Sequence, residues 1–216
     1  MAVNGSPKIE KGYTERILRP FIDGMKDAGA KVDILYTRRL NIKPCKGEFH
    51  CWNTELGVCI VKDDMESVMK FLKKADILVI ATPVYIPLPG EMQNFLNRLC
   101  PLINPVLTRR NGRTRARLHD DVKIRKIVLV STSGWWEMGN FGTVLRIAKE
   151  LAEDFSVEFA GALLRPHSYA LVKESAKAQK VYDAARKAGH DLVATGRMRK
   201  DVLATVSMPL VSSKYL

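Results

Sequence analysis

The sequence predicts an α/β protein built on a doubly wound parallel sheet. Short runs of Val, Ile and Leu alternate with segments of helical period, about five times along the chain, and the runs are apolar on both faces. Strands with two apolar faces need helices above and below them, and such strand–helix–strand units have right-handed crossovers. We therefore expect helices on both faces of one open sheet.

Five segments are expected to form the strands. The first is short, because Met1–Asn4 alone precede Gly5, whereas strands usually have about 5–6 residues. The other four are the apolar runs Lys31–Tyr36, Asp76–Ala81, Ile124–Thr132 and Val157–Leu164. Helical segments between them make a parallel arrangement the expected one.

Four helices are expected from apolar side chains at helical spacing: Thr14–Gly29, Asp63 to Lys74, Gly139–Phe155 and Lys173–Gly196. Pro20 should kink the first helix or delay its regular part. Asp63 and Glu66 have the spacing of a capping box, which predicts the start of the second. We expect residues 1–196 to form one domain, with an insertion over residues 37–64 and a tail over residues 197–216.

The composition excludes a chain that is disordered throughout. Apolar residues make up 46% of the 216 residues, which is enough for a full core. The longest apolar run is Ile77–Ala81, far short of the roughly 18 residues that cross a bilayer, and no apolar signal segment opens the sequence. We expect a soluble, cytoplasmic protein without a membrane partner and without structural disulfides.

Half of the net charge of +12 lies in one stretch. Residues Arg109–Lys126 contain eight basic and two acidic residues. Such a run is typical of a solvated loop or helix face, but it can also attract a phosphorylated cofactor or an acidic partner. We do not expect nucleic acid as a partner, because the run has no interleaved aromatic residues and no recognition motif.

The segment after the first strand has the composition of an anion site. Asn4-Gly5-Ser6-Pro7-Lys8 is followed by Gly12-Tyr13-Thr14 at a helix start. Ser6, Lys8 and Thr14 offer polar donors, and a helix amino terminus adds free N–H groups and a dipole that favour a phosphate. This is not a Walker A loop, and the chain has no G-x-G-x-x-G. The same residues also suit a plain turn in which Thr14 caps the helix.

Two further segments suit a flat aromatic ring. Thr82-Pro83-Val84-Tyr85 opens a proline-rich loop after one strand, and Ser133-Gly134-Trp135-Trp136 follows the next. Ligands of open α/β sheets bind beyond the carboxyl ends of the strands, so both segments should share an edge with the phosphate-type loop. A ring can stack on Tyr85 and bond to backbone groups there. Together the three loops point to flavin mononucleotide (FMN).

Over roughly residues 1 to 165 the chain resembles the iron–sulfur flavoprotein branch of the flavodoxin-like NAD(P)H-dependent FMN reductases. The resemblance rests on Gly5-Ser6-Pro7-Lys8 with Gly12 and Thr14, on Thr82–Tyr85, and on a cysteine segment, Pro44–Cys59, that precedes Asp63-Asp64-Met65. It implies a flavodoxin-like fold with strand order 2-1-3-4-5, bound FMN, and a homodimer or homotetramer whose subunits complete each other's flavin sites.

The resemblance also implies roles for individual residues. Ser6, Lys8 and Thr14 would hold the FMN phosphate. Pro83, Val84 and Tyr85 would flank the isoalloxazine ring, and Ser133 and Gly134 would close its other side. Tyr13 departs from the family, which commonly has Asn before this Thr.

Three of the four cysteines lie in the cysteine segment. Relatives that carry a four-iron cluster resemble C-x2-C-x2-C-x4–7-C, and here Cys45, Cys51 and Cys59 match the first, third and fourth positions while Glu48 stands at the second. A carboxylate is a poor substitute for a thiolate ligand. Three outcomes stay open: a loop without a cluster, a cluster with Glu48 or a non-protein fourth ligand, or a zinc site of Cys45, His50, Cys51 and Cys59. Cys100 is expected to be a buried small hydrophobe.

The resemblance implies an oxidoreductase in which FMN takes a hydride from NAD(P)H and passes electrons to a quinone, free flavin, oxygen or a protein acceptor. No side chain is needed as a general base, and the scattered histidines show no hydrolase pattern, so we assign no catalytic side chain. The alternative is an electron carrier with FMN, with or without a cluster, and no nicotinamide turnover. A basic run near the flavin could bind the dinucleotide or an acidic redox protein.

Overall fold

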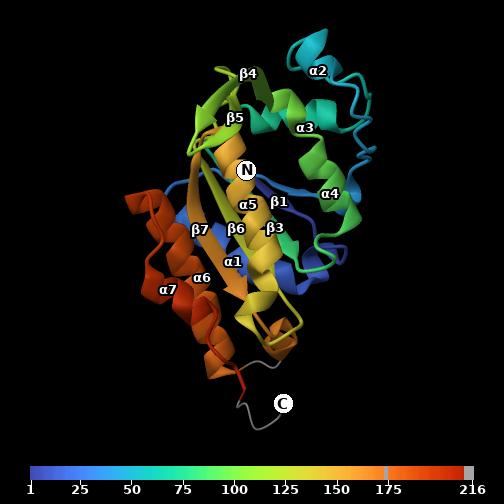
Figure 1. Ribbon diagram of the computed structural model, residues 1–216. Helices are drawn as coiled ribbons and strands as arrows, with labels where there is room; N and C mark the ends of the chain where they lie inside the picture. Colours follow the sequence, from blue (N-terminus) through green and yellow to red (C-terminus); the bar gives the residue numbers. More distant parts are fainter. Residues whose placement is uncertain (173–174, 212–216) are drawn as a thin grey trace.

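The computed structural model describes residues 1–172 and 175–211 (Figure 1). Five parallel strands form one sheet in the order β2-β1-β3-β6-β7. Their bounds are β1 Ala2–Asn4, β2 Ile34–Tyr36, β3 Ile77–Pro83, β6 Lys126–Thr132 and β7 Glu158–Arg165. Counted among themselves in chain order, these strands read 2-1-3-4-5, so the predicted flavodoxin-like fold is confirmed.

Helices cover both faces of the sheet. One layer holds α1 (Tyr13–Asp27) and α6 (Ala176–Thr195), with α7 (Lys200–Val206) packed beside α6. The other holds α3 (Met65–Leu72), α4 (Gly90–Asn97) and α5 (Gly142–Phe155). Successive side chains of the buried strands point to opposite layers, so each layer has its own apolar core.

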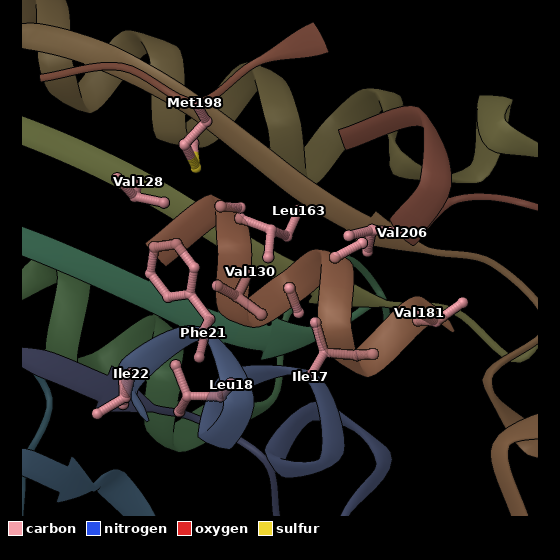
Figure 2. Close-up of a cluster of buried hydrophobic side chains, with 14 of the residues drawn as sticks. Ile17, Leu18, Phe21, Ile22, Val128, Val130, Leu163, Val181, Met198 and Val206 are labelled. Carbon is pink, nitrogen blue, oxygen red and sulfur yellow. The ribbon is translucent and has the colours of Figure 1, made fainter. Parts of the chain in front are cut away.

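The core beneath α1 and α6 also contains residues from the predicted tail. Figure 2 shows Met198 and Val206 beside side chains of β6, β7 and α1, and both residues are buried. Residues 197–211 therefore pack on the sheet of their own chain. Residues 212–216 of the predicted tail, like the predicted helix start at Lys173, lie outside the described residues.

Helix α1 is continuous from Tyr13 to Asp27 and includes Pro20, so its regular part is not delayed. A proline inside a helix removes one hydrogen bond and costs about 3 kcal/mol. Leu18, Phe21 and Ile22 on either side of it are fully buried in the core. Burial of side chains of this size contributes about 1.5–3 kcal/mol each, which is enough to hold the helix together.

The basic run forms an antiparallel hairpin that the alternation of strands and helices did not predict. Strands β4 (Ile103–Arg110) and β5 (Arg113–Leu118) pair with each other and not with the main sheet. In Figure 1 the β7 arrow points away from this hairpin. Arg110 donates to the carbonyl of Glu153 near the end of α5, at the amino-terminal edge of the sheet. Within this chain the hairpin therefore lies away from the carboxyl ends of the strands.

Most arginines of the hairpin have acidic partners. Arg113 and Arg115 pair with Glu150 of α5, and Arg115 also pairs with Asp154. Arg117 pairs with Asp120. Arg113 and Arg115 thus attach the hairpin to α5.

The predicted capping box of α3 was also wrong. The residue that precedes the helix is Asp64, which makes no side-chain cap. Asp63 accepts the N–H of Met65 at 3.0 Å, but its carboxylate is also bound by Arg98, and Glu66 pairs with Lys62 at the surface. A buried guanidinium thus uses a carboxylate that the local sequence assigned to capping. None of the helices in the described ranges is long and apolar enough to cross a membrane.

Candidate functional site

Backbone hydrogen bonds join the loops at the carboxyl edge of the sheet. Gly5 donates to Ala81 at 2.8 Å, which ties the loop after β1 to β3. Val84 donates to Thr132, and Ser133 donates to Arg165, which ties β3 to β6 and β6 to β7. The three predicted loops therefore follow neighbouring strands at one edge, as the sequence indicated.

The phosphate-type loop is built around Ser6 and Gly12. Ser6 is buried, and its N–H donates to Asn4 Oδ1 at 2.8 Å. A short 3-10 helix, Ile9–Lys11, leads to Gly12, which precedes α1 without a side-chain cap. A Cβ at position 12 would lie 2.4 Å from Ser6 Oγ, so only glycine leaves this hydroxyl in place. Lys8 is exposed on the same loop.

Thr14 lies inside the first turn of α1, so the alternative in which it caps the helix was wrong. Its Oγ1 lies 2.9 Å from Thr132 Oγ1 at the end of β6, and both residues are buried. This contact joins the phosphate-type loop to the strand that leads to Ser133.

A buried polar network supports this loop from below, and the sequence analysis did not identify it. Glu15 accepts from Asn4 Nδ2 at 2.9 Å, from Arg19 at 2.6 Å and from the Tyr36 hydroxyl at 3.1 Å. Burial and the Glu15 carboxylate raise the pKa of Tyr36 to about 12. The sequence feature that could have indicated this network is Asn4 at the end of a strand, followed by Glu15 in the first turn of the next helix.

The loop after β3 presents apolar groups to solvent. Pro83 and Val84 are half-buried, Tyr85 is exposed and Ile86 is 99% exposed. A cavity of about 540 Å³ lies between Pro7 of the phosphate-type loop and the segment from Tyr85 to Glu91. The structure thus brings the first ring-type loop next to the phosphate-type loop.

The loop after β6 contains the second ring-type segment. Ser133 is buried, and its Oγ accepts the N–H of Trp135 at 3.0 Å. Trp135 is 70% exposed, whereas Trp136 is half-buried and stacks on His167 with ring centroids 3.6 Å apart. A Cβ at Gly134 would meet the Tyr169 ring at 2.6 Å.

Tyr169 is a site residue that the sequence analysis missed. Its ring meets the Tyr13 ring edge to face, with centroids 5.1 Å apart. Tyr13 and Tyr169 therefore form an aromatic contact between the phosphate-type loop and the segment after β7. Only the fold could identify this pair, because the two residues are far apart in the sequence.

All four cysteines line a second cavity, of about 330 Å³. Cys51 lies on the short helix α2 (His50–Asn53), and Cys100 opens the 3-10 helix Cys100–Leu102 that follows α4. Burial and the neighbouring Cys51 thiol raise the pKa of Cys100 to about 12. The expectation that Cys100 is a simple core residue was wrong, because its thiol lies among the other three. Glu48 lines the same cavity.

A buried ion pair fastens the cysteine segment to α4. Arg98 binds Asp63 through two hydrogen bonds, of 2.6 and 3.0 Å, and both side chains are at most 1% exposed. Arg98 also donates to the carbonyls of Lys43 and Val61. Burial alone would raise the pKa of Asp63, but hydrogen bonds from Arg98, Lys43 and Met65 lower it below its usual value.

The zinc alternative has no support in the parts of the chain that the structure describes. No group of three His, Cys, Asp or Glu side chains within residues 1–172 and 175–211 is arranged to hold a metal ion. His50 does not line the cysteine cavity, and its Nε2 lies 3.8 Å from Glu55.

Solved structures with the same fold include two reductases. The chain is similar to the NAD(P)H:quinone oxidoreductase from Methanothermobacter marburgensis, with a TM-score of 0.61, 16% identity, and coverage of 88% of this chain and 94% of that one. It is also similar to an FMN-dependent NADH-azoreductase from Bacillus anthracis in complex with FMN, with a TM-score of 0.60, 13% identity, and coverage of 89% and 97%. At these identities the likeness supports the fold alone.

Curated proteins similar in sequence are named iron-sulfur flavoproteins. One of those from Archaeoglobus fulgidus is 33% identical over 99 residues, which cover 45% of this chain and 47% of that protein. The one from Methanosarcina thermophila is 26% identical over 98 residues, which cover 44% and 49%. The chain thus spans about half the length of the curated relatives that it matches.

A sequence model of the family described as NADPH-dependent FMN reductase matches residues 1–140. The match covers well over half of the chain and includes the phosphate-type loop, the cysteine segment and both ring-type loops. From this match and from the strand order, we conclude that the chain belongs to the NADPH-dependent FMN reductase family.

Proposed function

We propose that the protein is an FMN-dependent oxidoreductase that takes a hydride from NAD(P)H and passes electrons to a quinone, free flavin or protein acceptor. The observation that carries the proposal is the position of Gly12 beneath Ser6, at the start of α1 and next to two loops with exposed aromatic residues. A phosphate with a flat ring attached matches this combination of surfaces.

In this proposal Ser6, Lys8 and Thr14 hold the phosphate. Ser6 and Thr14 are already fixed, by Asn4 and by Thr132 respectively, so binding costs little further ordering. The amino end of α1 adds backbone N–H groups without intrahelical partners and a favourable dipole. Exposed Lys8 adds a positive charge at the rim of the loop.

Pro83, Val84 and Tyr85 would flank the ring on one side, and Ser133 and Gly134 would flank it on the other. When bound, FMN supplies the hydride and electron chemistry. The chain's own residues position the ring, and the absence of a Cβ at Gly134 keeps the Tyr169 ring close to the loop. No side chain is assigned as a general base.

The rim of the site suits a flat acceptor and a second copy of the chain. Tyr85, Ile86, Trp135 and Tyr169 are exposed at the carboxyl edge. Exposed apolar groups gathered at one site mark a contact surface. We propose that homodimers or homotetramers cover part of this rim and leave room for a nicotinamide ring and then a quinone.

The second candidate is an electron carrier without nicotinamide turnover. The cavity that gathers all four cysteines favours it, because a second redox centre would suit a relay. Steady-state oxidation of NADPH with a quinone separates the two candidates. Turnover supports the oxidoreductase, and flavin that is reduced only by a protein donor supports the carrier.

Flavin binding is tested with the purified protein and a matched pair of variants. Wild-type protein should show flavin absorbance or take up added FMN. Gly12→Ala should bind FMN about tenfold more weakly or worse, because displacement of Ser6 costs about 1–3 kcal/mol. Gly142→Ala is the control, since nothing lies within 4 Å of a Cβ built there. Wild-type protein that neither contains nor binds FMN would refute the proposal.

A further inference from the structure

We propose that Cys45, Cys51, Cys59 and Cys100 together hold a [4Fe–4S] cluster. In this proposal Cys100 supplies the fourth thiolate ligand, in place of the cysteine that Glu48 replaces in the motif. The site is separate from the proposed flavin site and does not depend on it. Three ligands come from the cysteine segment, and the fourth comes from the far end of α4.

The first support is that the four thiols line one cavity. Cys45, Cys51, Cys59 and Cys100 are the complete set of cysteines in the chain, and all of them line the 330 Å³ cavity. A cubane cluster is held by four cysteine thiolates, and each thiol releases a proton when it binds iron. The soft donor set is therefore complete without the carboxylate at position 48.

The second support is that Cys51 and Cys100 are held together by the surrounding structure. Trp52, which follows Cys51 on α2, donates its indole N–H to the carbonyl of Cys100 at 3.2 Å. Helix α2 also packs on the 3-10 helix that begins at Cys100. The ligand outside the cysteine segment is thus fixed relative to a ligand inside it.

The third support is an unpartnered donor in the cavity wall. The Arg98 side chain is 1% exposed and lines the cavity, and its Nε has no hydrogen-bond partner among the described residues. The Cys59 thiol lies beside this guanidinium. Four thiolates around a [4Fe–4S] core carry net negative charge, and their sulfurs accept N–H groups. A buried cation with a free N–H fits that occupant.

The arrangement suits a cluster better than a single ion. No group of three potential ligands in the described chain is placed around one metal ion. A cubane cluster does not need its ligands to converge on one ion, because each thiolate binds a different iron. Its four ligands need to surround a cavity instead. Cys45 is exposed, and its Sγ accepts the N–H of Gly47 at 3.4 Å. Binding of iron would draw this short loop onto the cavity.

The test uses full-length protein, reconstituted anaerobically with ferrous iron and sulfide. Wild type and Glu48→Gln should each contain about four irons and four sulfides per chain, with the electron paramagnetic resonance signal of a reduced cluster. Cys100→Ser should lose the cluster while it keeps its circular dichroism spectrum and its FMN content. A full cluster in Cys100→Ser, loss of the cluster in Glu48→Gln, or zinc without sulfide in wild type would overturn the proposal.

A double variant separates loss of a ligand from damage to the fold. Glu48 lines the same cavity, so a thiol at position 48 can replace the one removed at position 100. Cys100→Ser combined with Glu48→Cys should regain about four irons and four sulfides per chain. A folded double variant that binds no cluster would count against the ligand role of Cys100. FMN content, measured on the same samples, reports on the flavin site independently.

Discussion

The two sites that we propose lie at opposite ends of helix α4 and are built in different ways. At its amino end, the proposed flavin site consists of loops that each follow a strand of the main sheet. Backbone hydrogen bonds between neighbouring strands fix these loops, and a buried network of Asn4, Glu15 and Tyr36 supports them. The main sheet itself therefore sets the geometry of this site.

At the carboxyl end of α4, the cysteine cavity consists mostly of a long insertion with little regular structure. One short helix, α2, lies in it, and the segment is fastened to α4 by Arg98 and Asp63. The proposed flavin site is thus held by the main sheet, whereas the cysteine cavity is held by fewer contacts, chiefly the Arg98–Asp63 pair and the hydrogen bond from Trp52 to Cys100. The following predictions test that difference.

The largest effect is expected from Arg98→Met. Removal of one partner of a buried ion pair leaves an uncompensated charge and costs about 3–5 kcal/mol. Because Arg98 also binds the carbonyls of Lys43 and Val61, the loss should appear first as fast hydrogen exchange in residues 41–63. FMN binding at the other end of α4 should persist. Urea unfolding, hydrogen exchange and flavin titration measure these three results.

The control for this variant is Lys62→Met. Lys62 pairs with Glu66 at 3.9 Å, and both side chains are exposed, so the free energy of unfolding should change by at most about 1 kcal/mol. Equal effects of the two variants, or loss of FMN from Arg98→Met, would show that the two ends of α4 are not independent.

A smaller effect is expected at the carboxyl edge from Thr14→Val. The variant leaves Thr132 Oγ1 buried without its partner at 2.9 Å, which costs about 1–3 kcal/mol. Thr132→Val should cost a similar amount, and the double variant should cost less than the sum of the two. Exposed Thr143 on α5 offers the control, Thr143→Val, which should change little. Additive effects of the two buried substitutions would argue against a hydrogen bond between them.

The cysteine segment should also lose stability in acid. The pKa of Asp63 is lower in the folded chain than its unfolded value of about 3.9. The unfolded state therefore binds more protons as the pH falls, and the contribution of Asp63 is present above about pH 4 and is lost as the pH falls through the folded pKa. Urea unfolding of wild type and Asp63→Asn should differ most at neutral pH and converge in acid. A constant difference would mean that Asp63 does not titrate as proposed.

The same comparison explains what the sequence could predict. The five strands of the main sheet and the three loops at its carboxyl edge follow from local patterns, because each loop comes directly after its strand. The strand order, in contrast, was implied by the family resemblance. Cys100 was misjudged because its partners belong to another element, and nothing in Leu99-Cys100-Pro101 indicates them. Asp63 was assigned to a helix cap for the same reason, since Arg98 approaches it only in the fold. Tyr169 meets Tyr13 through tertiary structure alone.

The smallest effect is expected from the arginine hairpin, whose charge made it the most conspicuous part of the sequence. Strand β6 has 7 residues and leads from the hairpin's edge of the sheet to the carboxyl edge. At about 3.3 Å per residue, the two edges of the sheet are about 23 Å apart along this strand. This distance is more than twice the screening length of about 8 Å at physiological ionic strength. Arg113 and Arg117 are also paired with Glu150 and Asp120. The double variant Arg113→Gln/Arg117→Gln should therefore leave the KM for NADPH unchanged.

The matched variant at the carboxyl edge is Lys8→Gln. Lys8 is exposed on the phosphate-type loop, so loss of its charge should weaken FMN binding, and more so at low salt. Flavin titration and steady-state kinetics at two salt concentrations compare the two variants. A KM that rises in the hairpin variant but not in Lys8→Gln would mean that the hairpin acts on a site that its own chain does not form. The basic run would then have to reach the flavin of a second copy, because within one chain the length of the sheet separates the hairpin from the proposed flavin site.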